Sequence, residues 1–319
     1  MRTPRPWALP QHPALREHLP PGVTEAMIRT QLEAGKLVRL RSKVFLDAGL
    51  WPEDPAAQNV IRARAEQVAR PDAVLSHQSA ALVWGLPTPG VRPWHVLAPA
   101  LTLPSRSGYR SRRDPVRYVT GALPAHHVTR DPAGYQVTTP VRTAMDLAIG
   151  LSLPEALVLL DAAARQVCGS LVATPRRSDY ANPRMAGLAR EAMSEVADVL
   201  GVISLRTAIS LVDPRRETPI ESLTAGHLRL AGLPMPDFQR RISTAIGDFF
   251  VDCYWEGSPG LIGEADGAVK YNRPGEAVDE KVREQALRDT GERMVRWLGK
   301  EILFRPPVVM TRVANALGL

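Results

Sequence analysis

The sequence predicts an α/β protein of the α+β kind, built from three folded segments. Apolar residues recur at helical spacing in some stretches and at alternate positions in others, and Gly, Pro, Ser or Asp residues separate these stretches. The chain has 319 residues, of which 45% are hydrophobic and 23% charged, as is typical of a globular protein. At roughly 100–200 residues per domain, this length predicts two or three units. We place the domains at residues 1–70, 71–213 and 214–319.

The first segment reads as two helices followed by a hairpin. A short helix is expected at Ala14–Leu19, and Thr24 is a good N-cap for a second helix that ends at Gly35. In residues 37–46, basic side chains alternate with apolar ones at the period of a strand. This order is that of a winged helix with a basic wing, although an ordinary solvent-exposed strand pair is the alternative. In the winged-helix interpretation, the DNA contacts are Arg29, Arg39, Arg41 and Lys43.

The middle segment predicts mixed α and β structure. Ser76 is expected to cap a helix over His77–Trp84, which Gly85 closes. The remaining elements expected here are strands at Trp94–Leu97 and Val116–Thr120, helices at Pro140–Ala148, Pro154–Val167 and Met185–Leu200, and a linker over Gly169–Asn182.

An arginine-rich stretch lies within this middle segment, at residues 106–117. It contains five Arg, one Asp and one Tyr, a composition that can track a phosphate backbone. A solvated surface loop is the alternative. In the first interpretation, Arg110, Arg112 and Arg113 contact DNA.

The last segment predicts a helix, a hairpin and a long helix. Thr218 is a good N-cap for a helix that Gly232 ends. Two strand-like runs then follow, joined by a Gly-containing turn, and they predict a hairpin. These runs are Phe249–Trp255 and Leu261–Gly267, and a helix over Ala277–Thr290 leads from them to an apolar run at Arg293–Leu303.

Carboxylates within this hairpin suggest a metal site. Asp252 and Glu264 each lie among apolar residues of neighbouring strands, where a carboxylate is costly unless something pairs with it. Their oxygens can hold Mg²⁺ or Mn²⁺, with Asp266 as a further ligand. Glu221 from the preceding helix and Lys270 complete a candidate catalytic set with Asp252 and Glu264. Taken one at a time, these residues also fit an ordinary surface hairpin.

The motif around Glu264 resembles that of a family of endonuclease-like domains related to the very-short-patch repair endonucleases. The family pattern is E-x-D-G-x-x-K-Y, then E-K-x-R-E and V-x-R-W, and this chain has the first two at residues 264–271 and 280–284 and the shorter V-R-W at 295–297. The resemblance implies a PD-(D/E)XK restriction-endonuclease-like fold, a divalent metal and cleavage of DNA. In the core PD-(D/E)XK pattern, Lys follows the acid by two residues, whereas here Asp266 holds that place and Lys270 comes later.

A second resemblance covers the upstream part of the chain. Residues 76–81, 85–87 and 138–142, with Asp146, are similar to AbiEi-type antitoxins of abortive-infection systems. That resemblance implies a winged helix joined to a second domain, repression of its own operon and a cognate toxin encoded nearby. Two functions therefore stay open: a metal-dependent DNA endonuclease, or an autorepressor and antitoxin whose nuclease-like domain is not catalytic. Both bind double-stranded DNA.

Charge and cysteine content agree with either function. The chain has 40 Lys and Arg against 33 Asp and Glu, a net charge of +7 and an isoelectric point near 9.8, which favours an anionic partner. An Arg-rich composition is equally typical of a GC-rich genome. Two cysteines are too few for a disulfide or zinc framework, and no run of about 20 apolar residues predicts a membrane span. We therefore expect a cytoplasmic protein.

Overall fold

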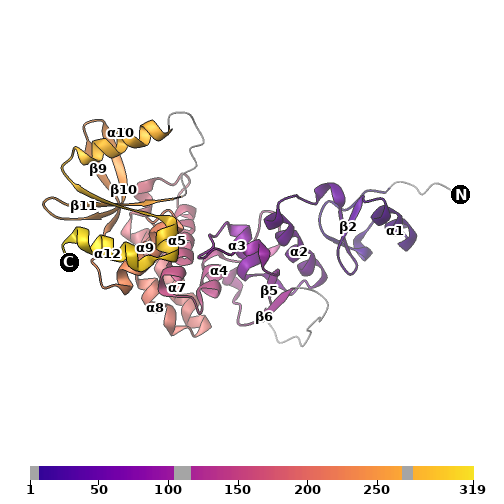
Figure 1. Ribbon diagram of the computed structural model, residues 1–319. Coiled ribbons are helices and arrows are strands. Elements are labelled where there is room, and N and C mark those ends of the chain that lie inside the picture. The colour runs from indigo at the N-terminus through magenta and orange to yellow at the C-terminus, as the bar shows by residue number, and fades with distance from the viewer. Residues whose placement is uncertain (1–6, 104–115, 268–275) are drawn as a thin grey trace. The chain divides into compact units, whose positions relative to one another are not determined.

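The computed structural model describes residues 7–103, 116–267 and 276–319 of the chain (Figure 1). The chain divides into two compact units. Unit 1 comprises residues 1–86 and 91–147, and unit 2 comprises residues 87–90 and 148–319. Helices combine with parallel and antiparallel strands, so the predicted α/β class is confirmed. The range 71–213, which the sequence suggested as one domain, is shared between the two units.

Unit 1 begins with a three-stranded sheet of order β1-β3-β2. Thr24 caps α1 as expected, because its side chain accepts a hydrogen bond from the Met27 amide. The helix expected at 14–19 is wrong: this stretch is strand β1 followed by a single 3₁₀ turn. The elements are β1 (Ala14–Leu15), a 3₁₀ turn (Arg16–His18), α1 (Glu25–Glu33), β2 (Leu37–Arg41), β3 (Val44–Asp47), a 3₁₀ turn (Ala48–Leu50) and α2 (Pro55–Ala69).

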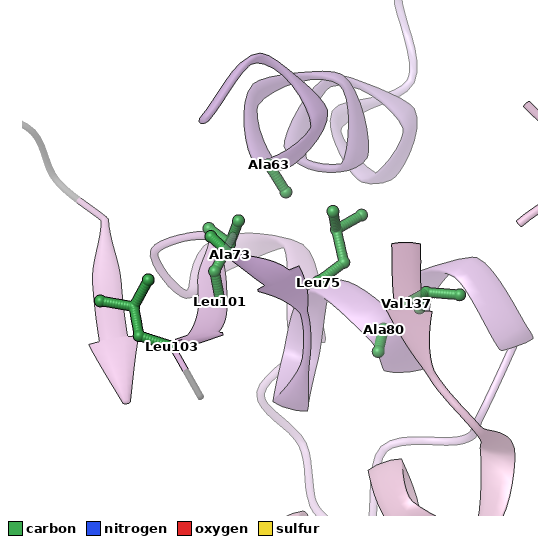
Figure 2. Packing of buried hydrophobic residues seen from close by; sticks show 7 residues of the cluster. All are labelled: Ala63, Ala73, Leu75, Ala80, Leu101, Leu103 and Val137. Carbon is green, nitrogen blue, oxygen red and sulfur yellow. The ribbon is translucent and has the colours of Figure 1, made fainter. Parts of the chain in front are cut away.

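A five-stranded mixed sheet of order β6-β5-β4-β8-β7 forms the rest of unit 1. Helix α2 covers it, and Ala63 of α2 packs in one buried cluster with Leu75, Leu101 and Val137 of the strands (Figure 2). The elements are β4 (Val74–Leu75), α3 (His77–Trp84), β5 (Ala100–Leu103), β6 (Arg117–Thr120), β7 (Val128–Arg130), β8 (Gln136–Thr138) and α4 (Pro140–Ala148), with 3₁₀ turns at Trp94–Val96 and Ala125–His127.

Two expectations for unit 1 are corrected. The strand expected at Trp94–Leu97 is a 3₁₀ turn, and the strand follows it at Ala100–Leu103. Ser76 precedes α3 as expected but makes no side-chain capping hydrogen bond, because its hydroxyl is 3.0 Å from Nδ1 of His77.

Unit 2 starts with a group of helices. Helix α5 packs closely against α9: a Cβ atom added to Gly226 would lie 2.4 Å from Cα of Pro154. Glycine is therefore the residue that allows the two helices to approach. The helices are α5 (Leu153–Ser170), α6 (Arg177–Tyr180), α7 (Pro183–Leu200), α8 (Arg206–Ser210) and α9 (Pro219–Leu230), with a 3₁₀ turn at Ile203–Leu205.

A four-stranded sheet of order β12-β11-β10-β9 completes unit 2. Strands β11 and β12 are parallel, whereas β9, β10 and β11 pair antiparallel. Leu287 of α10 packs with Val251 and Ile262, and Figure 1 shows α10 on one side of the sheet with α9 and α12 on the other. The elements are β9 (Asp237–Thr244), β10 (Gly247–Trp255), β11 (Leu261–Asp266), α10 (Glu276–Arg288), β12 (Arg293–Leu298), α11 (Gly299–Phe304) and α12 (Pro306–Leu317).

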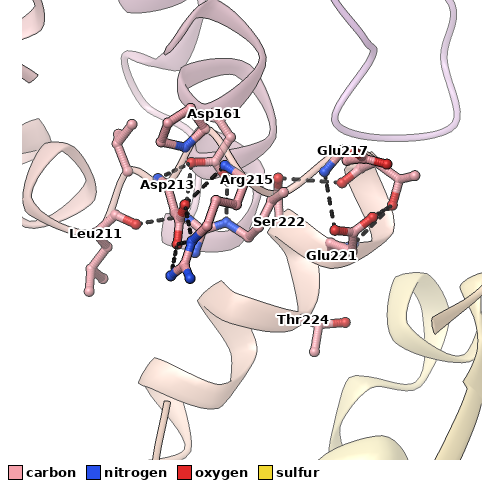
Figure 3. Close-up of polar contacts among 12 residues, drawn as sticks. Asp161, Leu211, Asp213, Arg215, Glu217, Glu221, Ser222 and Thr224 are labelled. Atoms are coloured by element: carbon pink, nitrogen blue, oxygen red, sulfur yellow. Dashed lines mark hydrogen bonds and ion pairs between the residues drawn. The ribbon is translucent and has the colours of Figure 1, made fainter. Parts of the chain in front are cut away.

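A buried ion pair fastens α5 to the segment that leads into α9. Arg216 donates to both oxygens of Asp161, at 2.6 and 2.8 Å, and each side chain is 1% exposed. The Asp213 amide adds a third hydrogen bond to Asp161 at 2.9 Å, in the network of Figure 3. Since each charge of a buried pair is costly without the other, this network holds the segment before α9 against α5.

Candidate metal centre

Asp252 lies where the strand pairing of β10 is interrupted on both sides. Its neighbours Val251 and Cys253 pair with β9, but Asp252 does not, because Gln239 opposite it has a left-handed backbone with φ of 54°. Towards β11, the regular pairing ends at Cys253, and the Asp252 carboxylate accepts the Ala265 amide at 2.8 Å instead. The Asp252 side chain thus fills a place that a backbone carbonyl has in a regular ladder.

The Gln239 amide joins Asp252 to Glu221. Its Nε2 donates to Oε2 of Glu221 at 2.9 Å and lies 3.4 Å from Oδ1 of Asp252. Glu221 is 2% exposed. It is fixed at the start of α9 because its carboxylate also accepts from the Thr218 hydroxyl at 2.8 Å and from the Glu217 amide at 3.1 Å (Figure 3). Helix capping therefore orients this carboxylate toward the sheet.

Glu264 on β11 is buried like Glu221, at 5% exposure. Arg283 of α10 donates to both of its oxygens, at 3.0 and 3.4 Å, and also to the Phe250 carbonyl at 3.0 Å. A forked guanidinium of this kind satisfies a buried carboxylate in both charge and geometry. α10 thus supplies the counter-charge of Glu264.

Asp266, expected as a further metal ligand, is held by an arginine. Arg296 of β12 donates to both of its oxygens, at 3.0 and 2.7 Å. The same guanidinium reaches Glu280 at 3.1 Å and Glu284 at 2.7 Å. Asp266 is thus an ion-pair partner of Arg296, as Glu264 is of Arg283.

Electrostatics separates the three inner carboxylates from ordinary surface acids. Burial raises the pKa of Glu221 to about 7, and the charge of Asp252 adds to this effect. Burial and the same Asp252 charge raise the pKa of Glu264 to about 7, against the lowering effect of Arg283. The pKa of Asp252 is also raised, chiefly by burial. Glu221 and Glu264 both respond to Asp252, so the three acids form one coupled group with Asp252 at its centre.

An open cleft of about 860 Å³ lies beside Asp252 and Glu264. Six acids line it, together with three basic residues, among the residues that the structure describes. An excess of acid at a cleft attracts cations. The acids are Asp252, Glu264, Asp266, Asp279, Glu280 and Glu284, and the basic residues are Lys281, Arg283 and Arg296.

The acids of this cleft offer oxygen donors, the type of ligand that a hard divalent cation prefers. Asp252 and Glu264 present carboxylate oxygens from adjacent strands at the cleft, and Glu221 approaches Asp252 through Gln239. Mg²⁺ prefers oxygen ligands and is bound by one or two carboxylates plus water and phosphate oxygens. A divalent cation would also favour the ionised forms of acids that burial otherwise disfavours.

The structure separates the proposed DNA contacts into two groups. Arg29, Arg39 and Lys43 are exposed. Arg41 is only 15% exposed in its side chain and pairs with Glu66 of α2, because the β2–β3 register shifts between Arg39 and Arg41. The strict alternation expected for the ribbon is therefore wrong at Arg41. Arg110, Arg112, Arg113 and the proposed catalytic Lys270 lie outside the described residues.

Sequence reasoning missed the parts that Gln239 and Arg283 play in the centre. Arg283 belongs to the motif at 280–284 that carries the endonuclease-like resemblance, and this is the signal that points to it. Gln239 of β9 bonds to Glu221 and Asp252, and Arg283 of α10 bonds to Glu264. Residue spacing does not predict these pairs, because the partners lie on different elements.

Comparison with known proteins finds distant relatives. The chain is 27% identical over 187 residues to two uncharacterized proteins of Mycobacterium tuberculosis, MT2308 of strain CDC 1551 / Oshkosh and Rv2248 of strain ATCC 25618 / H37Rv. The similar region covers 58% of this chain and 63% of each relative, so it spans less than two thirds of their length. No family model matches the chain, and no solved structure matches it.

Proposed function

We propose that unit 2 is a metal-dependent DNA endonuclease domain of the PD-(D/E)XK kind. One observation carries the proposal: two buried carboxylates, Glu221 and Glu264, both interact with the half-buried Asp252 where the β10 pairing is interrupted, beside an acidic cleft. Buried acids that raise one another's pKa reduce the stability of a fold, because each carboxylate is costly to desolvate. Perturbed acids at a cleft are typical of functional sites.

In this proposal, Asp252 and Glu264 hold Mg²⁺ or Mn²⁺. The bound cation would polarise the phosphodiester and activate a water molecule. Gln239 keeps Glu221 and Asp252 together, and Arg283 compensates Glu264 until a cation is present. Lys270 neutralises charge that develops on the phosphate.

In this proposal, unit 1 is a winged helix that binds duplex DNA and so brings unit 2 to its substrate. Arg29 on α1, Arg39 on β2 and Lys43 in the turn after β2 are exposed and positively charged, as duplex phosphates require. Among the described residues, no helix is long and apolar enough to cross a membrane. With DNA as the substrate, we propose a cytoplasmic location.

The test is a melting experiment paired with a cleavage assay. We expect Mg²⁺ or Mn²⁺ at about 100 times its dissociation constant to stabilise the protein by about 2.7 kcal/mol, which raises Tm by several degrees. Asp252→Asn and Glu264→Gln should abolish both this rise and the cleavage of plasmid or mismatched DNA. Asp198→Asn, an exposed carboxylate of α7, is the matched control and should behave as wild type. Wild-type protein that shows neither effect would refute the endonuclease.

A second function is favoured by one observation. Arg283 already neutralises Glu264, and Arg296 neutralises Asp266, so the acidic centre can be stable without a cation. In that case the protein acts as an autorepressor and AbiEi-type antitoxin. It would then bind the DNA upstream of its own gene and pair with a nucleotidyltransferase-like toxin encoded nearby. Binding to that DNA by a protein without metal response or cleavage would support this function.

A further inference from the structure

A second, smaller pocket of about 250 Å³ adjoins the carboxylate group within unit 2. We call it the arginine pocket, since four of its lining residues are arginines and none is acidic. It is lined from α5, α6, β9 and β10, with Tyr180, Gln239 and Phe250 among its other residues. The arginines are Arg165, Arg177, Arg215 and Arg241.

Aromatic rings and one shared acid orient two of these arginines. Arg165 lies over the Tyr180 ring at 3.9 Å, and Arg177 over the Phe250 ring at 4.5 Å. Both guanidinium groups reach the same carboxylate, Glu217, at 3.6 and 3.1 Å. Because one acid is shared by two cations, the pair retains positive charge. Stacked guanidinium planes of this kind present their N–H groups in a fixed direction.

The other two arginines differ in how firmly they are held. Arg215 is engaged by Asp213 and Asp237, so its role is chiefly structural. Arg241 has a 62% exposed side chain and a single exposed acidic partner, Asp248. Arg177 is 41% exposed. Arg177 and Arg241 are therefore the pocket cations that a solvent-borne anion can reach.

Gln239 connects the arginine pocket to the carboxylate group. Its Oε1 accepts from Arg177, while its Nε2 donates to Glu221 and approaches Asp252. A site for an anion and a site for a cation thus share one side chain. A nucleic-acid strand can occupy both sites, because each phosphate is followed by another along the backbone.

We propose that the arginine pocket binds a DNA phosphate group, next to the phosphodiester held at the carboxylates. The second half of this statement rests on the proposed endonuclease function. The pocket is smaller than the roughly 300–1,000 Å³ of sites for drug-sized ligands, which suits a phosphate and excludes a base pair. Guanidinium groups are the preferred bidentate ligands of phosphate. Internal phosphodiesters and terminal phosphates share this chemistry.

The test measures DNA binding by the full chain in EDTA, so that metal-dependent cleavage does not occur. Fluorescence anisotropy is followed over a series of KCl concentrations, with a short duplex that carries or lacks 5′ phosphates. For Arg177→Gln with Arg241→Gln, we expect about a tenfold or greater loss of affinity and a log–log salt slope reduced by about 1 to 2. The control Arg206→Gln removes a 68% exposed arginine from α8 and should bind as wild type.

The outcomes separate this proposal from the endonuclease. A loss confined to the 5′-phosphorylated duplex assigns the pocket to a strand end, and an equal loss with both duplexes assigns it to the internal backbone. If the double variant folds, as judged by its Tm, and binds like Arg206→Gln, the pocket assignment is refuted even where Asp252-dependent cleavage is seen. If wild-type protein never cleaves DNA but the double variant loses binding, the pocket stands and the endonuclease fails.

Discussion

His77 shows how a single residue can make stability depend on pH. Its backbone is left-handed, with φ of 48°, and its ring is 7% exposed at the start of α3. Burial lowers the pKa of His77 to about 4, and the charges of Arg117 and Arg142 add to this effect. The histidine is therefore neutral in the folded protein over a range in which the unfolded chain is already protonated.

The sign of the pH effect follows from this lowered pKa. Above about pH 6.5, His77 is neutral in both the folded and the unfolded chain, and the free energy of unfolding is not reduced by its titration. As the pH falls from 6.5 toward 4, the unfolded chain binds a proton that the folded protein does not, so the free energy of unfolding decreases by roughly 3 kcal/mol in total. We expect His77→Asn, which tolerates a left-handed backbone, to remove this part of the acid sensitivity. The measurement is urea unfolding of wild type and variant at pH 7.5 and pH 4.5. If both proteins lose the same free energy of unfolding between pH 7.5 and pH 4.5, the assignment of this acid sensitivity to His77 is wrong.

At the scale of elements, two helical glycines provide a matched pair. Gly226 in α9 faces Pro154 of α5, so a methyl group added there would overlap the partner backbone. Gly187 in α7 has nothing within 4 Å of the corresponding position. The two sites share the intrinsic preference of a helix for Ala over Gly and differ in packing alone.

We expect these glycines to respond with opposite sign when changed to alanine. Gly226→Ala should destabilise the protein by about 1–3 kcal/mol, because α5 and α9 must move apart. Gly187→Ala should stabilise it by about 0.5–1 kcal/mol, since only helix propensity changes. Chemical denaturation of both variants gives the two free energies of unfolding. If Gly226→Ala leaves the free energy of unfolding unchanged, α5 and α9 can move apart without loss of stability, and the prediction is contradicted.

At the scale of the whole molecule, the placement of α5 decides where a stable fragment can begin. Asp161 of α5 is buried against Arg216, and Pro154 of α5 lies against Gly226. A fragment 148–319 keeps both contacts. A fragment 214–319, which starts at the boundary suggested by the sequence, loses them and leaves the Arg216 charge unpaired. Loss of one partner of a buried ion pair costs about 3–5 kcal/mol.

We therefore expect the two fragments to differ sharply. Fragment 148–319 should melt cooperatively and show native near-UV circular dichroism, whereas fragment 214–319 should lack both. In the first fragment, the double change Asp161→Leu with Arg216→Met should be less harmful than Arg216→Met alone, because no charge is then left buried. Cooperative melting of fragment 214–319 would contradict this division of the chain.

The sequence by itself determined the local features of this protein. The α/β class, the cap of α1 at Thr24, the Thr218 start of α9 and the two strands that carry Asp252 and Glu264 follow from spacing, capping residues and turn residues. Such signals are local in the chain, since they depend on neighbours within a few residues.

Only the tertiary structure decided which charges meet. Arg41, a DNA contact in the sequence interpretation, pairs with Glu66; Asp266, a metal ligand in that interpretation, pairs with Arg296; and Gln239 joins Glu221 to Asp252. These partners are 25, 30 and 18 or 13 residues apart in the chain. Pairing of side chains from different elements depends on how those elements pack, and the spacing of residues in the sequence does not contain this information. The fold therefore decides which partner each charged residue has.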